Sequence, residues 1–310
     1  MTELPYRSYS RYLLERFGGE VRRVAVDAGF GCPTRRDGRG LGGCSYCSAE
    51  GSRAPSIGEP DAAPALRAQI RASIAFIRRG HPEAGLILYF QAFSCTNAAV
   101  EDLARLYEEG LASGQFLGLN VATRPDCIDR DKARMLASFA DRGLEVWVEL
   151  GLQSAHDRTL RRIDRGHTSG DFLRAYRLLK QEGLNIAVHL ILGLPGESEV
   201  DMAATARFIA ALDPDGVKIH NLHIPRSSPM CREYLAGELT APGPERHLRC
   251  TIAVLEQLPV RTVVMRLTTD TPAAMLAAPR GFWPKQQFTD RLVQQMRLSG
   301  ARQGRLCARP

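Results

Sequence analysis

Short apolar runs alternate with longer amphipathic segments through the middle of the chain. Apolar runs of four to eight residues bounded by turn signals are typical of buried strands, whereas apolar positions three and four apart are typical of helices. The pattern predicts six strands, at residues 22–27, 86–91, 117–123, 145–151, 186–193 and 216–221. It predicts five intervening helices, at residues 62–79, 98–113, 129–142, 169–182 and 198–212. Gly143 and Gly183 stand where two of these helices should end, just before a new strand.

Alternating strands and helices predict parallel βα units, so the expected fold class is α/β. Such units form either a doubly wound open sheet or a barrel. No G-x-G-x-x-G motif opens a helix after the first strand, which disfavours a dinucleotide-binding sheet. Polar residues gather at the carboxyl ends of the strands, where barrel enzymes build their sites. Six units fall short of eight, so we expect a partial (βα)6 TIM-type barrel whose open side admits a substrate larger than a metabolite.

The character of the chain changes near residue 226, after which prolines punctuate a loop. A helix, a strand and a second helix are predicted after this loop, at residues 245–257, 261–267 and 285–298. About 85 residues make a small core by themselves. We therefore expect an N-terminal segment at 1–20, a barrel at 21–225, and an α/β extension at 226–310 packed on the barrel.

Composition places the 310-residue chain among ordinary globular proteins, with 44% hydrophobic and 24% charged residues. No apolar run approaches the length of a spanning helix, and the first twenty residues lack the apolar core of a signal peptide. We therefore expect a cytoplasmic protein without membrane contact.

The charge is unevenly distributed: the net charge is +7, and residues 226–310 alone hold 13 basic and 6 acidic residues. Arginine supplies 37 of the 41 basic residues, and its forked guanidinium suits bidentate contact with phosphate. A polyanionic partner such as nucleic acid is one explanation, and genome composition is the other.

Three of the eight cysteines, Cys32, Cys44 and Cys47, follow the first predicted strand with C-x11-C-x2-C spacing. Disulfides are rare in the cytoplasm, so metal ligation is the natural interpretation. A structural zinc site takes four protein ligands, and His81 is the candidate for a fourth. A [4Fe–4S] cluster held by three thiolates instead leaves one iron open for a non-protein ligand, as three cysteines require.

The motif 30–47 resembles the cluster-binding loop of the radical S-adenosylmethionine (SAM) enzymes. The usual spacing in that superfamily is C-x3-C-x2-C, and the longer first gap here resembles the small YhcC/YtqA-type branch related to the elongator catalytic subunit. The resemblance runs nearly end to end, through residues 89–93, 123–127, 147–154, 165–167, 189–197, 218–223, 266–268 and 283–285.

This resemblance implies that Cys32, Cys44 and Cys47 hold a [4Fe–4S] cluster whose open iron binds SAM. It implies reductive cleavage of SAM to methionine and a 5′-deoxyadenosyl radical that abstracts a substrate hydrogen, with flavodoxin or ferredoxin as electron donor. The candidate SAM-binding residues are Gln91, Glu149, Gln153, Arg165, Gly193, Pro195, Gly196 and His223.

These SAM contacts have ordinary alternatives. Gln91 stands where many radical SAM enzymes carry the carboxylate of a Gly-Gly-Glu strand end, and Glu149 is a candidate for supplying that missing charge or binding the ribose. Arg165 suits the SAM carboxylate, or is a surface charge at a helix end. Residues 193–197 resemble the adenine-contacting turn of the family, or form a plain strand-to-helix loop.

Other side chains at strand ends have less certain roles. His189, His220 and His223 either line the cavity or, in a hydrolytic barrel, hold a metal, which would leave the cysteine motif unexplained. Cys95 and Cys127 are either hydrogen donors to a radical or small buried apolar residues.

The branch to which the sequence is similar implies a tRNA substrate with a modified wobble uridine. The expected reaction converts carboxymethylaminomethyl to aminomethyl, with the basic extension holding tRNA phosphates. The alternative is a radical SAM enzyme acting on a small molecule or peptide, and a remote alternative is a zinc-ribbon-like protein that binds nucleic acid.

Overall fold

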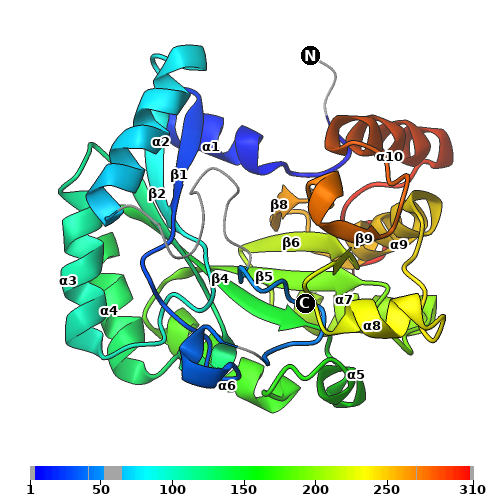
Figure 1. The fold of residues 1–310 in the computed structure, drawn as a ribbon. Helices are drawn as coiled ribbons and strands as arrows, with labels where there is room; N and C mark the ends of the chain where they lie inside the picture. The colour runs from blue at the N-terminus through cyan, green and yellow to red at the C-terminus, as the bar shows by residue number, and fades with distance from the viewer. Residues whose placement is uncertain (1–3, 41, 52–64, 270, 308–310) are drawn as a thin grey trace.

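The computed structural model describes residues 4–40, 42–51, 65–269 and 271–307 (Figure 1). Parallel strands form one curved sheet in the order β1-β2-β3-β4-β5-β6-β8. Their bounds are β1 Val21–Val26, β2 Gly85–Phe90, β3 Gly118–Thr123, β4 Glu145–Gln153, β5 Asn185–Leu192, β6 Gly216–Asn221 and β8 Val263–Arg266. In the described part of the chain, β1 and β8 have one neighbour each in this sheet, so the barrel is partial, as expected.

Helices between the strands cover the outer face of the sheet (Figure 1). They are α2 Leu66–Gly80, α3 Val100–Leu111, α4 Arg130–Asp141, α6 Ser169–Gln181 and α7 Glu199–Ala210. All five were predicted within a few residues, although positions 62–64 of the first lie outside the described residues. Thr168 and Ser198 begin α6 and α7 with capping boxes, and Gly143 and Gly183 follow α4 and α6 at φ 86° and 72°.

The sheet contains one strand more than the six expected in the barrel. The strand predicted in the extension is β8, which pairs in parallel with β6, with Gly216 opposite Val263. This pairing satisfies backbone groups of β6 that an edge strand would leave open. The proposed division near residue 226 stays a prediction, and the sheet itself continues beyond it.

The rest of the extension packs on this seventh strand and on the helices beside it. Helix α9, Pro244–Gln257, packs against α7 and against α10, Lys285–Ser299. The short strands β7, Ile224–Pro225, and β9, Leu276–Ala278, pair antiparallel. Helix α8, Met230–Leu235, lies beside β7.

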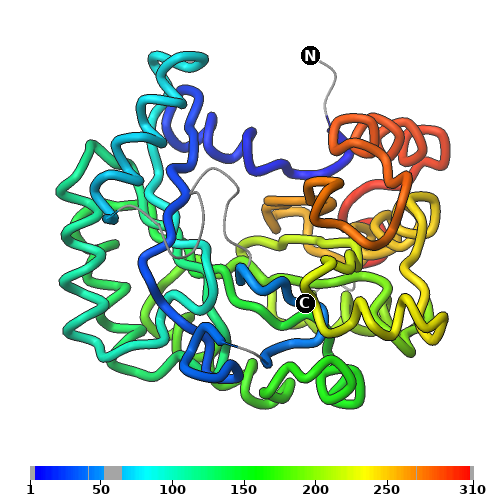
Figure 2. Tube along the Cα trace, viewed as in Figure 1, coloured from blue at the N-terminus to red at the C-terminus, as the bar shows by residue number. Residues whose placement is uncertain are grey.

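An N-terminal helix, α1 (Tyr9–Phe17), was not predicted, and it fills the end of the barrel at the amino ends of the strands. Ser8 bridges to Val264 of β8, and the chain then crosses to β1, as Figure 2 shows for the blue segment. The rings of Tyr9 and Tyr12 make T-shaped contacts with Trp147 of β4, with ring centroids 6.0 and 5.5 Å apart. This helix joins the two edges of the partial barrel.

In the described residues no helix combines the length and the apolar character needed to cross a bilayer.

Candidate active site

Alternation along the strands arranges the interior of the barrel in layers, because successive side chains point to opposite faces. The lowest layer is apolar, with Trp147, Ile87 and Ala187 packed near α1. Two residues further along their strands, Tyr89, Glu149 and His189 form a polar layer. The strand ends above this layer open into a cavity.

This cavity has a volume of about 430 Å³ and is lined by all three motif cysteines, Cys32, Cys44 and Cys47. All three are free thiols. The structure thus brings the cysteine motif of the first loop to the strand ends, where a barrel enzyme places its chemistry.

The loop from β1 folds back on itself to bring the three thiols together. The backbone N–H of Cys32 donates to Gly38 O at 2.6 Å, and that of Cys47 donates to Cys44 O at 3.0 Å. Gly43 has φ 85°, and a Cβ on it would lie 3.0 Å from Cγ of Arg35. Glycine at this position therefore allows both the turn and the close approach of Arg35.

Three arginines surround the thiols. Arg35 Nη2 lies 3.2 Å from Cys47 Sγ, and Nη1 of the same side chain donates to Ala49 O at 2.7 Å. Arg124 Nη1 and Arg165 Nη1 lie 3.6 and 3.4 Å from Cys44 Sγ. Arg124 and Arg165 are both buried, so their charges act on the sulfur with little screening.

The arginines divide the three thiols electrostatically. Burial raises the pKa of Cys44, but the charges of Arg165 and Arg124 outweigh it, and the pKa falls below its ordinary value. Burial and the neighbouring Cys47 raise the pKa of Cys32 to about 11. The pKa of Cys47 also lies above its ordinary value, through burial and Cys44. Cys44 is therefore the first of the three to ionise.

These residues fit an iron–sulfur cluster better than a zinc ion. Within the described ranges, no three His, Cys, Asp or Glu side chains are grouped to hold one metal ion, so the thiols surround a cavity without converging on a point. Guanidinium groups directed at sulfur suit an anionic thiolate cluster. His81, the candidate fourth zinc ligand, instead lies 3.0 Å from Glu20 at the opposite end of the barrel.

The candidate SAM-binding residues fall into two groups. Five of them line the cavity with the thiols: Gln91, Glu149, Gln153, Arg165 and His223. The glycines and proline of the 193–197 turn are absent from the cavity lining. A Cβ on Gly193 would lie 2.4 Å from Pro242 Cγ, so this glycine admits the extension rather than opening toward the thiols.

Cys95 and Cys127 are buried beside the cavity but do not line it. Cys95 Sγ lies 3.2 Å from Ala92 O, and Cys127 Sγ lies 3.8 Å from Asn97 Oδ1. Their surroundings are those of small buried residues.

Glu149 is the centre of a buried network that sequence reasoning missed. Its side chain has 0% exposure and accepts a hydrogen bond from Tyr89 and one from Lys218 Nζ at 2.5 Å. His189 Nε2 lies 3.2 Å away, and Arg23 Nη1 3.6 Å. Their positions along five strands were the available signal, because all five side chains point into the barrel.

Burial and charge set the protonation of this network. Burial raises the pKa of Glu149, yet Lys218, His189 and Arg23 hold it well below its ordinary value. Burial lowers the pKa of Lys218 to about 7 against the pull of Glu149. Burial and the charge of Lys218 lower the pKa of His189 to about 4. The polar layer beneath the cavity thus contains a carboxylate beside a neutral imidazole.

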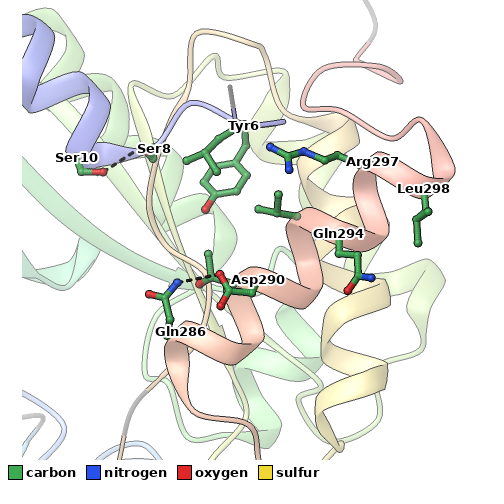
Figure 3. A pocket seen from close by; sticks show the side chains of 11 residues that line it. Tyr6, Ser8, Ser10, Gln286, Asp290, Gln294, Arg297 and Leu298 are labelled. Atoms are coloured by element: carbon green, nitrogen blue, oxygen red, sulfur yellow. Dashed lines mark hydrogen bonds between the residues drawn. The ribbon is translucent and has the colours of Figure 1, made fainter. Parts of the chain in front are cut away.

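A second hollow, about 790 Å³, lies between the N-terminal segment and α10 (Figure 3). Tyr6 points toward Asp290, and burial together with that carboxylate raises the pKa of Tyr6 to about 12. Gln286 donates to Asp290 at 2.9 Å. Its described lining contains no thiol and no histidine, so the chemistry belongs to the cavity at the strand ends.

Two family models match the chain. The model described as the radical SAM superfamily matches residues 30–209, and the one described as the radical SAM C-terminal domain matches residues 214–297. Together they span the thiol loop, the barrel and most of the extension.

Individual relatives cover nearly all of the chain. It is 34% identical to the uncharacterized protein YtqA of Bacillus subtilis, over 99% of this chain and 94% of YtqA. It is 32% identical to protein YhcC of Escherichia coli, over 94% of each. A tRNA uridine(34) acetyltransferase of Methanocaldococcus infernus is 29% identical over 59% of this chain and 35% of its own length.

A solved structure shares the fold. The archaeal Methanocaldococcus infernus Elp3, with an N-terminal deletion, superposes with a TM-score of 0.67 at 22% identity, covering 77% of this chain and 60% of that one.

Proposed function

Because this chain belongs to the radical SAM superfamily, and within it to the YtqA/YhcC-type proteins, we propose that it acts on a modified wobble uridine of tRNA. As a member of that superfamily it is a [4Fe–4S]-dependent radical SAM enzyme that uses SAM. The observation that carries the proposal is the lining of one cavity. It contains the three thiols of the cysteine loop, two of which contact arginines, together with Lys218, His220 and Arg266 of β6 and β8.

Cys32, Cys44 and Cys47 are the residues proposed to hold the cluster. When bound, the cluster and SAM supply a one-electron reduction that cleaves SAM and yields a radical able to abstract a substrate hydrogen. Arg35, Arg124 and Arg165 stabilise the thiolates through the contacts described above. An electron-transfer protein such as flavodoxin or ferredoxin is proposed as the electron donor. A cytoplasmic location of the enzyme is proposed as well.

SAM itself is proposed to lie across the carboxyl ends of β2 to β4. Gln91 and Gln153 line this part of the cavity, and the buried Nε of Arg165 has no hydrogen-bond partner in the described ranges. A buried unpaired donor is costly, so Arg165 is well suited to receive the carboxylate of a ligand. His223 lines the opposite wall. Contact of Gly193, Pro195 and Gly196 with the adenine of SAM is supported by the family resemblance alone.

A wobble uridine is supported by sequence similarity. This chain is 29% identical to a tRNA uridine(34) acetyltransferase over 59% of its length. The proposed reaction removes the carboxymethyl part of a carboxymethylaminomethyl group. SAM oxidises the methylene carbon of the carboxymethyl group by two electrons, and water then cleaves its bond to nitrogen. In sum, substrate, SAM and water give aminomethyluridine, glyoxylate, methionine, 5′-deoxyadenosine and one proton.

Mass spectrometry of tRNA from a deletion strain tests the substrate. We expect carboxymethylaminomethyluridine to accumulate at the wobble position and its aminomethyl derivatives to disappear, with restoration by the wild-type gene but not by the Cys44→Ala variant. Unchanged wobble uridines would contradict the proposal and favour a small molecule or peptide as substrate.

A further inference from the structure

Arg266 lies at the carboxyl end of β8 and lines the cavity on the side away from the cysteine loop. Its guanidinium makes no hydrogen bond and no ion pair with any residue that the structure describes. Guanidinium groups are charged at all accessible pH values and rarely stay without an anion in a partly buried site.

The other cations of the cavity already have partners. Arg124 pairs with Asp126 at 2.8 Å, and Lys218 pairs with Glu149. Arg35 and Arg165 donate to backbone carbonyls as well as lying beside the thiols. Arg266 is therefore the cation of the described lining that is left over.

The carboxylate of Glu149 is already paired with Lys218, so it does not neutralise the charge of Arg266. Among the described lining residues Glu149 is the single carboxylate. Lys218, Tyr89 and His189 contact its Oε2, and Arg23 lies 3.6 Å from its Oε1, which has no hydrogen-bond partner among these residues. The charge of Arg266 consequently remains uncompensated: after burial, it is the largest contribution lowering the pKa of His220.

His220 adds a second unfilled position beside this cation. Its Nδ1 lies 2.9 Å from Thr269 Oγ1, whereas its Nε2 is buried without a hydrogen-bond partner among the residues that the structure describes. When the Thr269 hydroxyl donates to Nδ1, Nε2 carries the hydrogen and is a free donor. A guanidinium and an imidazole N–H on one wall match the two oxygens of a carboxylate.

Resting on the proposed function, we infer that Arg266 and His220 bind the carboxylate of the substrate's carboxymethyl group. The methylene next to that carboxylate is then held between this wall, on β6 and β8, and the thiol wall on the β1 loop. The product has lost the carboxylate and keeps its positively charged amine, so the same wall repels it. Arg266 thereby distinguishes substrate from product, because an unpaired buried charge penalises a ligand that lacks the matching group.

Binding to short RNAs tests this inference without turnover. The reconstituted enzyme is titrated without reductant with three anticodon stem-loops, whose wobble uridine carries carboxymethylaminomethyl, aminomethyl or no modification. We expect the wild-type protein to bind the first about tenfold more tightly than the second, the range of one charged hydrogen bond. Arg266→Gln should bring this ratio close to one, and Arg266→Lys should retain part of it.

A matched control is Arg261→Gln, at a residue shortly before the first residue of β8. Arg261 is exposed and pairs with Asp213, so its loss should leave the ratio unchanged. Equilibrium dialysis with labelled SAM on the same variants gives a second readout, which Arg266→Gln should not alter.

The outcomes separate the two proposals. Three outcomes would overturn the carboxylate site while leaving a tRNA substrate in place. They are equal binding of the first two stem-loops by the wild-type protein, an unchanged affinity ratio in Arg266→Gln, and an Arg266→Gln variant that loses affinity for SAM while keeping the ratio. Failure of all three stem-loops to bind the wild-type protein would overturn both the tRNA substrate and the site that rests on it.

Discussion

The three thiols differ in their surroundings although they share one cavity. Cys44 lies between two buried guanidinium groups, Cys47 beside one, and the pKa of Cys32 is raised to about 11 by burial and by Cys47. Binding of iron requires all three as thiolates, so the arginines favour assembly of the cluster by stabilising negative charge.

Loss of any motif thiol should abolish the cluster. We expect Cys32→Ala, Cys44→Ala and Cys47→Ala to lose the iron content, the broad visible absorption and the reductant-dependent 5′-deoxyadenosine of the anaerobically reconstituted enzyme. Cys250→Ala, which removes a buried thiol of α9, is the matched control and should keep all three. If each motif variant kept its iron and its 5′-deoxyadenosine formation, the cluster assignment would be wrong.

His247 gives the fold a measurable response to acid. Burial lowers its pKa to about 4, and its ring packs on Phe288 while Nε2 lies 2.8 Å from Leu267 O. Since the unfolded imidazole titrates near 6.5, the unfolded state binds more protons between pH 6.5 and 4. The stabilisation is complete above pH 6.5 and is lost as the pH falls toward 4.

Urea unfolding at pH 7 and pH 5 measures this effect. The free energy of unfolding should fall on acidification, and His247→Gln should make the fall smaller by about 2 kcal/mol, since one pKa unit corresponds to about 1.4 kcal/mol. The same slope in wild type and His247→Gln would contradict the prediction.

At the scale of elements, α1 completes a barrel that its strands leave open. It runs between the edges formed by β1 and β8, and its buried face fits the apolar floor around Trp147. Tyr12 donates to Glu145 at the start of β4, which fixes the helix against the sheet. The polar layer with Glu149 lies directly above this floor, so α1 keeps water from reaching it.

Removing one aromatic ring from this helix should destabilise the whole barrel. Tyr9 is 7% exposed, and Tyr9→Ala should lower the free energy of unfolding by about 3 kcal/mol through the cavity it leaves. Leu14→Ala, at a residue of the same helix that is 54% exposed, should change it by less than about 0.5 kcal/mol. Equal effects of the two substitutions would show that α1 does not contribute to the core.

At the scale of the molecule, the positive charge of the extension has a defined position relative to the cavity. Arg226 follows β7 and Arg232 lies on α8, both beyond the carboxyl end of β6, and Arg280 follows β9, which pairs with β7. All three are exposed, and among the described residues none of them pairs with a carboxylate.

Binding of tRNA should therefore depend on salt through these arginines. Each phosphate contact contributes close to one unit to the slope of log affinity against log salt. Replacing Arg226, Arg232 and Arg280 by Gln should reduce that slope by close to 3, about one unit for each arginine. The triple Gln variant of Arg71, Arg105 and Arg130, on α2 to α4, is the control and should keep the wild-type slope. Equal slopes in both variants would place the tRNA elsewhere.

Much of the architecture and part of the site followed from the pattern of the chain. Six strands of the sheet and the helices between them are set by local periodicity, and the helices are further marked by their caps. Helix α1 was missed because its short amphipathic sequence is stabilised by Trp147, more than a hundred residues away. β8 was predicted as a strand, but its neighbour β6 could be known only from the fold.

The cysteine spacing and the motifs around it were sufficient by themselves to identify the family and its cofactors, because thiolate ligation depends on residue type and short separation. Only the tertiary structure decided which side chains share the cavity. Glu149 is one carboxylate among many in the sequence and a buried partner of Lys218 in the fold. Arg266 is one arginine among many until the fold leaves it without a partner in the described part of the chain. Electrostatic roles of this kind depend on distance and burial, and closing the barrel fixes both across strands far apart in the chain.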